Sequence, residues 1–326
     1  MKYKFHIYRG LQFLIVMAIF LGCRDKDKDG KPLDTPTSGG ITIAVDESLR
    51  PIVDAEIAAF MAIYKNAEIK AVYGSETASI NSLLHDSVRL AIVNRPMLAQ
   101  EVSVMKGQRI SPSTVKVGTG AIALIVNKDN PDVSISLDQL RALFRGQVDQ
   151  WNQIDSGSTL GAIKIIFDHD HAHSIRYMKD SLAKVPRLPA NCYAVSSNGQ
   201  VMDYVSRNKG ALGIIGVSWI SDNDDSETLG FLKSIQVMAL SGKGKTADHR
   251  FYKPYQAYIA QGLYPLTHPV YIISREARTG LGSGFMSFVA GEKGQRVILK
   301  AGLVPATMPV RVIQFDDRDI RYNGSD

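Results

Sequence analysis

Two serines and one arginine of this chain have the chemistry and the position to bind a small anion. Ser75 and Ser174 each stand at the start of a stretch with helical periodicity, where unpaired backbone N–H groups and the helix dipole favour negative charge. Arg95 follows a short apolar run and can pair two N–H groups with two oxygens of a tetrahedral anion. Helix capping by the serines and an ion pair of the arginine are the alternatives. We predict that these residues contribute to an oxyanion site.

Acidic residues occupy loops of the same kind. Glu47 follows the first strand pattern of the sequence, and Asp168 follows a later one. A carboxylate at such a place accepts the proton of a monohydrogen anion, but it repels a fully ionised anion. The other use of these acids is an ion pair with a nearby arginine, which we favour.

Alternating histidines offer a different chemistry. His169, His171 and His173 would face one way on an extended loop, and with Asp168 or Asp170 they could ligate zinc or copper. A polar loop that enters a helix explains the same pattern, and the sequence shows no evident further ligand group. Metal binding is therefore kept as an alternative function.

The elements that must position these residues alternate between strands and helices. Residues Ile41–Val45, Ile69–Tyr73 and Leu90–Val93 are short apolar runs rich in β-branched residues. Helix-period stretches stand between them, and the first of these opens at Pro51. This spacing predicts a parallel sheet whose polar loops gather at the carboxyl ends of the strands, the edge where such folds bind ligands.

A second set of such units follows an apolar strand at residues 121–126. The turn Asn127–Pro131 is a candidate hinge, and Ser136–Gln139 forms a capping box before a helix. Further strands are predicted at residues 163–167, 193–195 and 212–215, and a helix begins at Asn198.

The last apolar segments return to the first set of strands. They comprise strands at 235–240 and 270–274 and a helix over 284–301 that Gly302 ends. Two crossings of the chain are typical of a hinged clamshell, so the fold class is α/β, with two lobes, mixed and mainly parallel sheets, and a ligand cleft between the lobes. The predicted divisions are 1–22 for a signal peptide, 23–40 for a lipidated cysteine and flexible tether, 41–128 plus 230–316 for lobe 1, 129–229 for lobe 2 and 317–326 for a polar tail.

The N-terminal residues have the pattern of an export signal. Basic residues at positions 2, 4 and 9 precede an apolar run from Leu11 to Gly22 that ends at Cys23. This run is shorter than the ~20 apolar residues that span a membrane. Phe20-Leu21-Gly22-Cys23 resembles a bacterial lipobox, although leucine or valine is usual in place of Phe20. We expect cleavage before Cys23 and its acylation, with a plain secretory leader as the alternative.

The charge of the chain argues against a nucleic-acid partner. The formal net charge is +6, and three basic leader residues leave 6 − 3 = +3 for residues 23–326. Basic and acidic residues are interspersed, whereas binding to a phosphate backbone needs a clustered basic face. Cys192 is the only cysteine besides Cys23. We therefore expect no internal disulfide in an acylated chain, and a buried structural thiol at Cys192.

The sequence gives little support to an enzyme. A hydrolase with Ser75 or Ser174 as its nucleophile would be the clearest case, but the chain has no Gly-x-Ser-x-Gly elbow, no Cys–His pair in a suitable context and no P-loop. We expect no catalytic residue and no cofactor.

Several motifs, in their order along the chain, resemble the phosphate-type substrate-binding proteins of ABC transporters. They are Val45-Asp46-Glu47-Ser48, Tyr73-Gly74-Ser75-Glu76, Leu90 to Pro96, Ala123 to Pro131, Leu140 to Trp151, Phe167 to Ser181, Gly210 to Gly213 and Tyr264-Pro265-Leu266. The likeness covers about residues 41–310 and is nearest to PstS-like lipoproteins of Bacteroidetes-type bacteria. It implies the type II periplasmic-binding-protein clamshell.

The resemblance also implies ligand contacts. Such proteins hold the ligand with the loop after the first strand, a Gly-Ser segment, a Ser-Arg-Pro-like segment and a Ser-Gly-Thr-like helix start. The last of these reads Ala172-His173-Ser174 here, and Asp168 stands where an arginine is frequent. Arg95 and Arg176 remain as cations that compensate. The expected contacts are Glu47, Ser48, Ser75, Glu76, Asn94, Arg95, Asp168, His173, Ser174 and Arg176.

Together these observations predict a monomeric, lipid-anchored protein of the cell envelope, in the periplasm or at the outer membrane. It would capture phosphate or a related small oxyanion for an ABC transporter permease. Besides metal binding, the alternatives are a sensory or scaffold lipoprotein on the same fold and, less favoured, a hydrolase.

Overall fold

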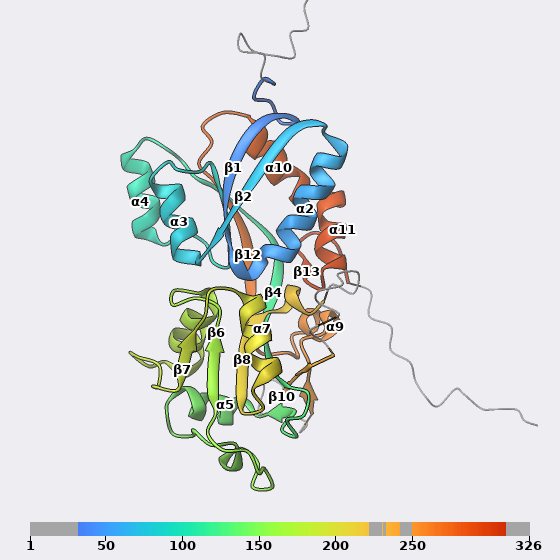
Figure 1. The fold of residues 1–326 in the computed structure, drawn as a ribbon. Helices are drawn as coiled ribbons and strands as arrows, with labels where there is room; N and C mark the ends of the chain where they lie inside the picture. Colours follow the sequence, from blue (N-terminus) through green and yellow to red (C-terminus); the bar gives the residue numbers. More distant parts are fainter. Residues whose placement is uncertain (1–31, 222–229, 231–232, 242–249, 311–326) are drawn as a thin grey trace, which may run out of the picture.

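The chain folds into two lobes that meet along one long strand (Figure 1). A computed structural model describes residues 32–221, 230, 233–241 and 250–310. The expected signal peptide, Cys23 and the polar tail lie outside these residues. Within them, the main sheet has the strand order β2-β1-β3-β12-β4-β8-β6-β7.

The first lobe contains the predicted parallel strands. β1 (Ser38–Asp46) pairs in parallel with β2 (Asn66–Gly74) and β3 (Leu90–Val93). β12 (Thr267–Ser274) then pairs antiparallel with β3, so the sheet is mixed, as the α/β clamshell requires. Because the three parallel strands run the same way, their carboxyl ends all face the second lobe (Figure 1).

Helices cover both faces of this sheet (Figure 1). α3 (Glu76–Leu84) and α4 (Ala99–Gly107) lie on one side, and α4 is a helix that the sequence pattern missed. The other side holds α2 (Arg50–Ile63), which has Pro51 in its first turn, together with α10 (Leu281–Ala290) and α11 (Glu292–Lys300). α10 and α11 replace the single helix predicted over 284–301, because Gly291 between them is extended.

The lobes share β4 (Ser113–Asn127), which is 15 residues long. At about 3.3 Å per residue such a strand spans both lobes. Residues 113–121 pair with β12, whereas residues 122–126 pair with a strand of the second lobe. The return crossing lies near Leu266, whose carbonyl accepts a hydrogen bond from Ile122 N at 2.8 Å. Strand pairing thus puts residues 122–127, 235–241 and 251–252 with the second lobe.

The second lobe repeats the strand-and-helix pattern. β8 (Ala211–Gly216) lies between β4 and β6 (Lys164–Phe167), and β6 pairs in parallel with β8 and with β7 (Cys192–Ala194). The capping box at Ser136 is present and begins α5 (Leu137–Phe144). This lobe also contains α7 (Asn198–Arg207), α6 (His173–Arg176) with a π-helical turn over Tyr177–Ala183, η2 (Trp151–Gln153), β9 (Ile235–Val237), and a small sheet of β11 (Phe251–Tyr252), β10 (Ala239–Ser241) and β5 (Ser134–Ile135). The remaining elements of the described chain are η1 (Glu47–Leu49), η4 (Val217–Trp219), α9 (Gln256–Ala260) and β13 (Val304–Pro305), which pairs with β4.

Part of the segment expected as a tether packs on the first lobe. The Asp34 carboxylate accepts hydrogen bonds from Leu281 N at 3.0 Å, at the start of α10, and from Arg89 at 2.5 Å. The Pro36 carbonyl lies so close to Gly284 that a Cβ there would come within 1.8 Å of its oxygen. Residues 34–38 are therefore held on α10, and a flexible tether would have to lie before them.

Cys192 is half-buried and forms no disulfide in the structure. Burial raises the pKa of its thiol to about 12, so the group stays protonated and unreactive at neutral pH. No helix in the described part of the chain has the length and apolar composition needed to cross a membrane.

Glu56 on α2 is a buried acid without a partner. Its side chain is 2% exposed, and the described residues offer neither carboxyl oxygen a hydrogen bond. Burial raises the pKa of Glu56 to about 9, so the carboxyl group is neutral at pH 7.

We expect Glu56→Gln to remove a pH-dependent loss of stability. The folded pKa lies above the ordinary value, so the stability that Glu56 contributes is fully present below about pH 4.5 and is lost as pH rises towards 9. Relative to wild type, the Tm of the variant should rise between pH 5 and pH 8 by about 5 °C or more. Thermal unfolding at both pH values measures this change. Glu68→Gln, at an exposed position of β2, is the control, and an equal change there would contradict the assignment to Glu56.

Candidate functional site

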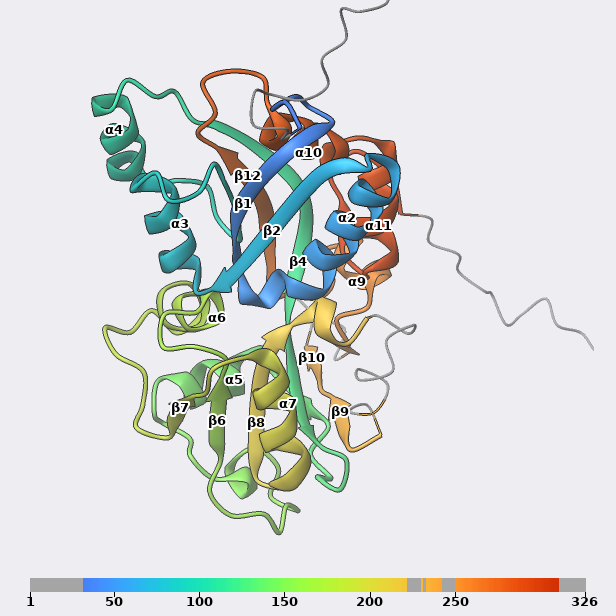
Figure 2. The same cartoon turned by 45° about the horizontal axis from the view of Figure 1, so that its top comes forward.

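Polar residues from both lobes gather in one buried cluster between them. The carboxyl ends of β1, β2 and β3 face the carboxyl ends of β6 and β8, and α6 lies at the junction beneath the tip of β2 (Figure 2). Loops that follow these strands therefore meet. This interlobe cluster comprises Asp46, Glu47, Ser48, Glu76, Asn94, Arg95, Asp168, His173, Ser174, Arg176 and Asn198.

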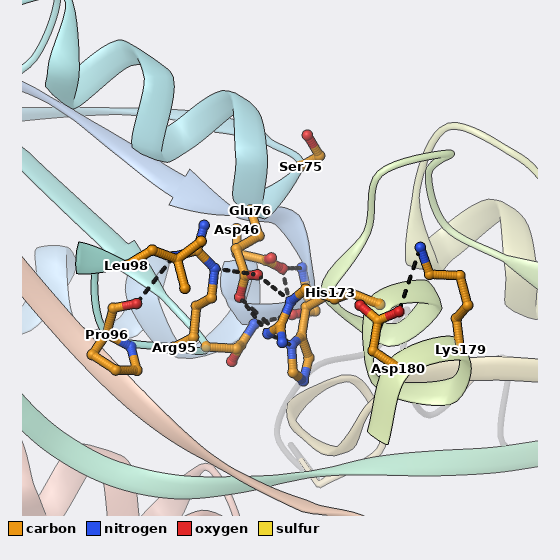
Figure 3. Close-up of polar contacts among 12 residues, drawn as sticks. Asp46, Ser75, Glu76, Arg95, Pro96, Leu98, His173, Lys179 and Asp180 are labelled. Carbon is orange, nitrogen blue, oxygen red and sulfur yellow. Dashed lines mark hydrogen bonds and ion pairs between the residues drawn. The ribbon is translucent and has the colours of Figure 1, made fainter. Parts of the chain in front are cut away.

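The Glu76 carboxylate binds an arginine from each lobe, and Figure 3 shows Glu76 beside Arg95, the arginine of the first lobe. Glu76 is the first residue of α3, and its side chain points into the cluster. Its Oε1 lies 3.2 Å from Arg95 Nε, which follows β3 of the same lobe. The same oxygen accepts a hydrogen bond from Arg176 Nε of the second lobe at 2.8 Å, and Oε2 lies 3.3 Å from Arg176 Nη2. Two guanidinium groups thus converge on one anion.

Arg95 has a second carboxylate partner in its own lobe. Its two terminal nitrogens donate to the two oxygens of Glu101 at 2.8 and 2.7 Å, the fork geometry that fixes a guanidinium plane. Glu101 also accepts a hydrogen bond from Leu98 N at 2.7 Å at the start of α4. Glu101 therefore orients Arg95 while Nε faces Glu76.

His173 lies within the same group as a neutral imidazole. Arg176 Nη2 donates to His173 Nδ1 at 3.0 Å, and since a guanidinium only donates, Nδ1 is the acceptor and the ring proton is on Nε2. Burial lowers the pKa of His173, which agrees with this assignment. Burial acts to raise the pKa of Glu76, but the Arg176 guanidinium outweighs it and lowers that pKa. Glu76 is therefore ionised at neutral pH.

A second set of contacts crosses between the lobes at Asn198, the first residue of α7. Its backbone N donates to Glu47 Oε2 at 3.1 Å, and its side-chain amide donates to the same oxygen and to Asp168 Oδ2, the latter at 3.2 Å. The side-chain Oδ1 of Asn198 accepts a hydrogen bond from Gly216 N at 3.2 Å. Ser174 Oγ donates to the other Asp168 oxygen at 3.2 Å. One amide thus separates two acidic side chains from opposite lobes.

Asp46 organises the loop after β1. Its Oδ1 accepts hydrogen bonds from Ser48 N at 2.9 Å and Ser48 Oγ at 2.5 Å. Asn94 Nδ2 in turn donates to Ser48 Oγ at 3.1 Å, which joins the loop after β3 to the loop after β1.

The remaining carboxyl groups of the cluster bind protons more tightly than usual. Burial, together with the charge of Asp168, raises the pKa of Asp46 to about 8. Burial also raises the pKa of Glu47 to about 7, although its hydrogen bonds with Asn198 oppose this, and it raises the pKa of Asp168. Protons therefore neutralise part of the acidic cluster near pH 7, and a protonated carboxyl group can donate a hydrogen bond.

Several buried polar atoms of the cluster lack a hydrogen-bond partner among the described residues. They are Asp46 Oδ2, Glu47 Oε1, Asn94 Oδ1 and His173 Nε2. Buried polar groups are normally hydrogen-bonded, because an unmade bond costs about 1–3 kcal/mol. Unpartnered donors and acceptors that lie together are suited to a small polar ligand.

The two lobes approach one another closely beside this cluster. A Cβ at Gly216 would come within 2.7 Å of the Ser48 carbonyl oxygen, so only glycine fits there without a shift. Ser218 Oγ donates to the same carbonyl at 2.9 Å. Gly216 and Ser218 belong to the second lobe and Ser48 to the first, so the structure is a closed clamshell.

The structure brings most of the predicted contact residues together, and Ser75 is the exception. Its Oγ accepts a hydrogen bond from Ala78 N at 3.2 Å, which caps α3, and its side chain points away from the cluster (Figure 3). Ser174 lies within α6, a helix of 4 residues, and its hydroxyl group is bonded to Asp168. The residues that do gather are Glu47, Ser48, Glu76, Asn94, Arg95, Asp168, His173, Ser174 and Arg176. Ligand contact by any of them stays a prediction.

The alternative metal site is wrong. His171 is exposed, whereas His173 is buried against Glu76. His169 Nδ1 contacts the Asp168 carbonyl oxygen at 2.5 Å. The loop turns into α6 and is not extended, so the alternating side chains do not share one face. In the described part of the chain, no group of three His, Cys, Asp or Glu side chains is arranged to hold a metal ion.

Sequence reasoning missed Asp46, Glu101 and Asn198 as members of the site. Asp46 ends the first strand, so its position at the sheet edge was a usable signal. Asn198 was predicted only as the start of a helix, and its contact with Glu47 joins residues 151 positions apart. Glu101 lies on α4, which the pattern did not predict.

Comparisons with known proteins agree on one family. A family model described as the PBP superfamily domain matches residues 31–293. The phosphate-binding protein PstS of Bacillus subtilis is 22% identical over 312 residues, which cover 91% of this chain and 94% of that protein. Protein SphX of Synechococcus elongatus is 22% identical over 290 residues, which cover 87% of this chain and 82% of that protein.

Solved structures share the two-lobed architecture. A phosphate ABC transporter substrate-binding protein of Clostridium perfringens, solved with bound phosphate, superposes with a TM-score of 0.67 at 18% identity and covers 82% of this chain and 99% of its own. An ABC-type phosphate transport receptor of Vibrio cholerae gives a TM-score of 0.58 at 20% identity, with 82% and 100% covered. At these identities the likeness establishes the fold.

We expect Asn198→Asp to destabilise the closed chain strongly. A carboxylate has the shape of the amide but cannot donate to Glu47 and Asp168, and it adds a third acid at a fully buried position. The cost should be about 3 kcal/mol, measured by urea unfolding at pH 8. Asn152→Asp adds the same charge at an exposed position and is the control. Equal stability of the two variants would show that Asn198 does not hold the acidic pair.

Proposed function

The chain belongs to the PBP superfamily, and we propose that it is an extracytoplasmic solute-binding protein that captures phosphate between its lobes for an ABC transporter. One observation carries this proposal. Arg95 of the first lobe and Arg176 of the second converge on a single buried anion, the Glu76 carboxylate. A site with cations on both lobes binds an oxyanion best when the lobes close around it.

The relatives support phosphate as the ligand. The Bacillus subtilis protein is named for phosphate binding and aligns with this chain over nearly its full length. The Clostridium perfringens structure, which holds phosphate, has the same fold. Relatives of this kind are transport proteins, which favours capture and delivery over catalysis.

The cluster offers both donors and acceptors to such a ligand. Arg95 and Arg176 supply charged N–H groups, and His173 Nε2 is a buried donor with no partner among the described residues. Asp46 and Glu47 can donate when protonated and accept a phosphate proton when ionised. The resembled family frequently has an arginine where this chain has Asp168. Here Arg176, the last residue of α6, supplies the cation of the second lobe instead.

The envelope setting belongs to the same proposal. Acylation at Cys23 would hold the protein at a membrane, and residues 24–33 would serve as the tether to the packed segment. The protein would act as a monomer that meets a permease. These points rest on the sequence pattern, and a mass measurement of the membrane fraction for an acylated Cys23 tests the anchor.

Phosphate should raise the Tm of the chain from residue 24 in a dose-dependent way, because a ligand that binds only the folded state stabilises it by mass action.

Arg176→Ala should weaken phosphate binding at least 10-fold in calorimetry, as expected for the loss of a charge-assisted hydrogen bond. Arg207→Ala, an exposed arginine on α7 paired with Asp203, is the matched control and should bind like wild type. A flat titration with phosphate, sulfate and arsenate would remove the oxyanion function.

A further inference from the structure

We propose that Glu76 is an internal substitute for the ligand: its carboxylate occupies the anion position between Arg95 and Arg176, and phosphate enters by displacing it. The inference rests on the proposed function and deepens it, because it makes Glu76 the residue that sets the affinity of the site.

The Glu76 carboxylate already has the surroundings of a bound oxyanion. It is 2% exposed, it is ionised, and it receives guanidinium N–H groups from opposite lobes at 3.2 and 2.8 Å on one oxygen. Its contact with Arg176 also ties the lobes together, since Glu76 and Arg176 are 100 positions apart and belong to different lobes. This ion pair adds a charged contact to the interlobe hydrogen bonds of Asn198 and Ser218.

A ligand anion cannot share this position with Glu76. Two negative charges in contact within a buried site oppose each other's ionisation. Burial raises the pKa values of Asp46, Glu47 and Asp168, and the charge of Asp168 adds to this effect for Asp46 and Glu47. Glu76 differs from them, because its pKa is lowered and it stays charged. Phosphate can therefore pair with both arginines only after the Glu76 side chain has left.

The local structure allows Glu76 to leave without unfolding α3. The helix is capped by Ser75 Oγ, which accepts from Ala78 N, and this cap does not involve the Glu76 side chain. Rotation about the side-chain torsions can move the carboxylate while the helix start is kept. Release of Arg176 would then let the lobes separate and admit a ligand.

With competition of this kind, the apparent affinity for phosphate is the intrinsic affinity multiplied by the fraction of molecules in which the arginines are free. Glu76→Gln keeps the size of the side chain and removes the charge, so it should raise the affinity for phosphate. Glu101→Gln removes a charge from the same arginine, but Glu101 lies in the lobe of Arg95 and fixes its plane through two hydrogen bonds. That variant should bind phosphate more weakly, which gives a control of opposite sign.

The test compares wild type, Glu76→Gln and Glu101→Gln by phosphate calorimetry and by small-angle scattering without phosphate. We expect Glu76→Gln to bind at least 10-fold more tightly and, without phosphate, to have a larger radius of gyration than wild type, because the lobes lose their ion pair. Glu76→Ala repeats the test without a side-chain amide, and thermal unfolding confirms that each variant is folded.

The outcomes separate this inference from the proposed function. If wild type binds phosphate and neither Glu76 variant binds more tightly, Glu76 is not a competitor and the inference is overturned, while the proposed function stands. If no variant binds phosphate at millimolar concentration, the proposed function itself fails. Binding by the Glu76 variants alone would support both.

Discussion

The ion pair of Glu76 with arginines from both lobes is the constraint on which the closed structure depends. A buried carboxylate must be paired, because an uncompensated charge in a site of this kind is strongly destabilising. Arg95 alone is already shared with Glu101, so full compensation requires Arg176 from the other lobe. The charge of Glu76 is therefore fully compensated only where the two lobes meet.

The other acids of the cluster are neutralised in a different way. Arg50 reaches Glu47 only at 3.7 Å, and for Asp46 and Asp168 the described contacts are hydrogen bonds from Ser48, Ser174 and Asn198. Burial raises the pKa values of these three carboxyl groups. Because these pKa values are higher in the folded chain than in the unfolded chain, the stability that the groups contribute is present below about pH 4. It is lost as pH rises through 7 to 8. A rise in pH thus favours both the ionisation of these groups and the opening of the lobes.

Local sequence pattern predicts the parts of this structure that depend on neighbours along the chain. The strand at residues 41–45, the helix that opens at Pro51 and the capping box at Ser136 are all present because periodicity and caps are local properties. The site is different, since Glu76 with Arg176 and Glu47 with Asn198 join residues 100 and 151 positions apart. Ser75 shows the limit most clearly. Its position before a helix predicted both capping and ligand contact, and the structure shows the capping bond, with the side chain turned away from the cluster. β4 likewise pairs with strands of both lobes, a double role that the pattern of one apolar strand does not reveal.

Asp168 and Arg176 together account for the difference between this chain and the family pattern that it resembles. With Asp168 in place of an arginine, the loop after β6 loses a cation, and the Asp168 carboxyl group is instead bonded by Ser174 and Asn198. The cation of the second lobe is then Arg176 at the end of α6, and it reaches across to the start of α3. An acid at position 76 follows from this arrangement, because two arginines facing each other across closed lobes would repel without an anion between them. Closure of the lobes and capture of an anion are consequently the same event, whether the anion is Glu76 or a ligand, and the affinity of the site is set by the competition between the two.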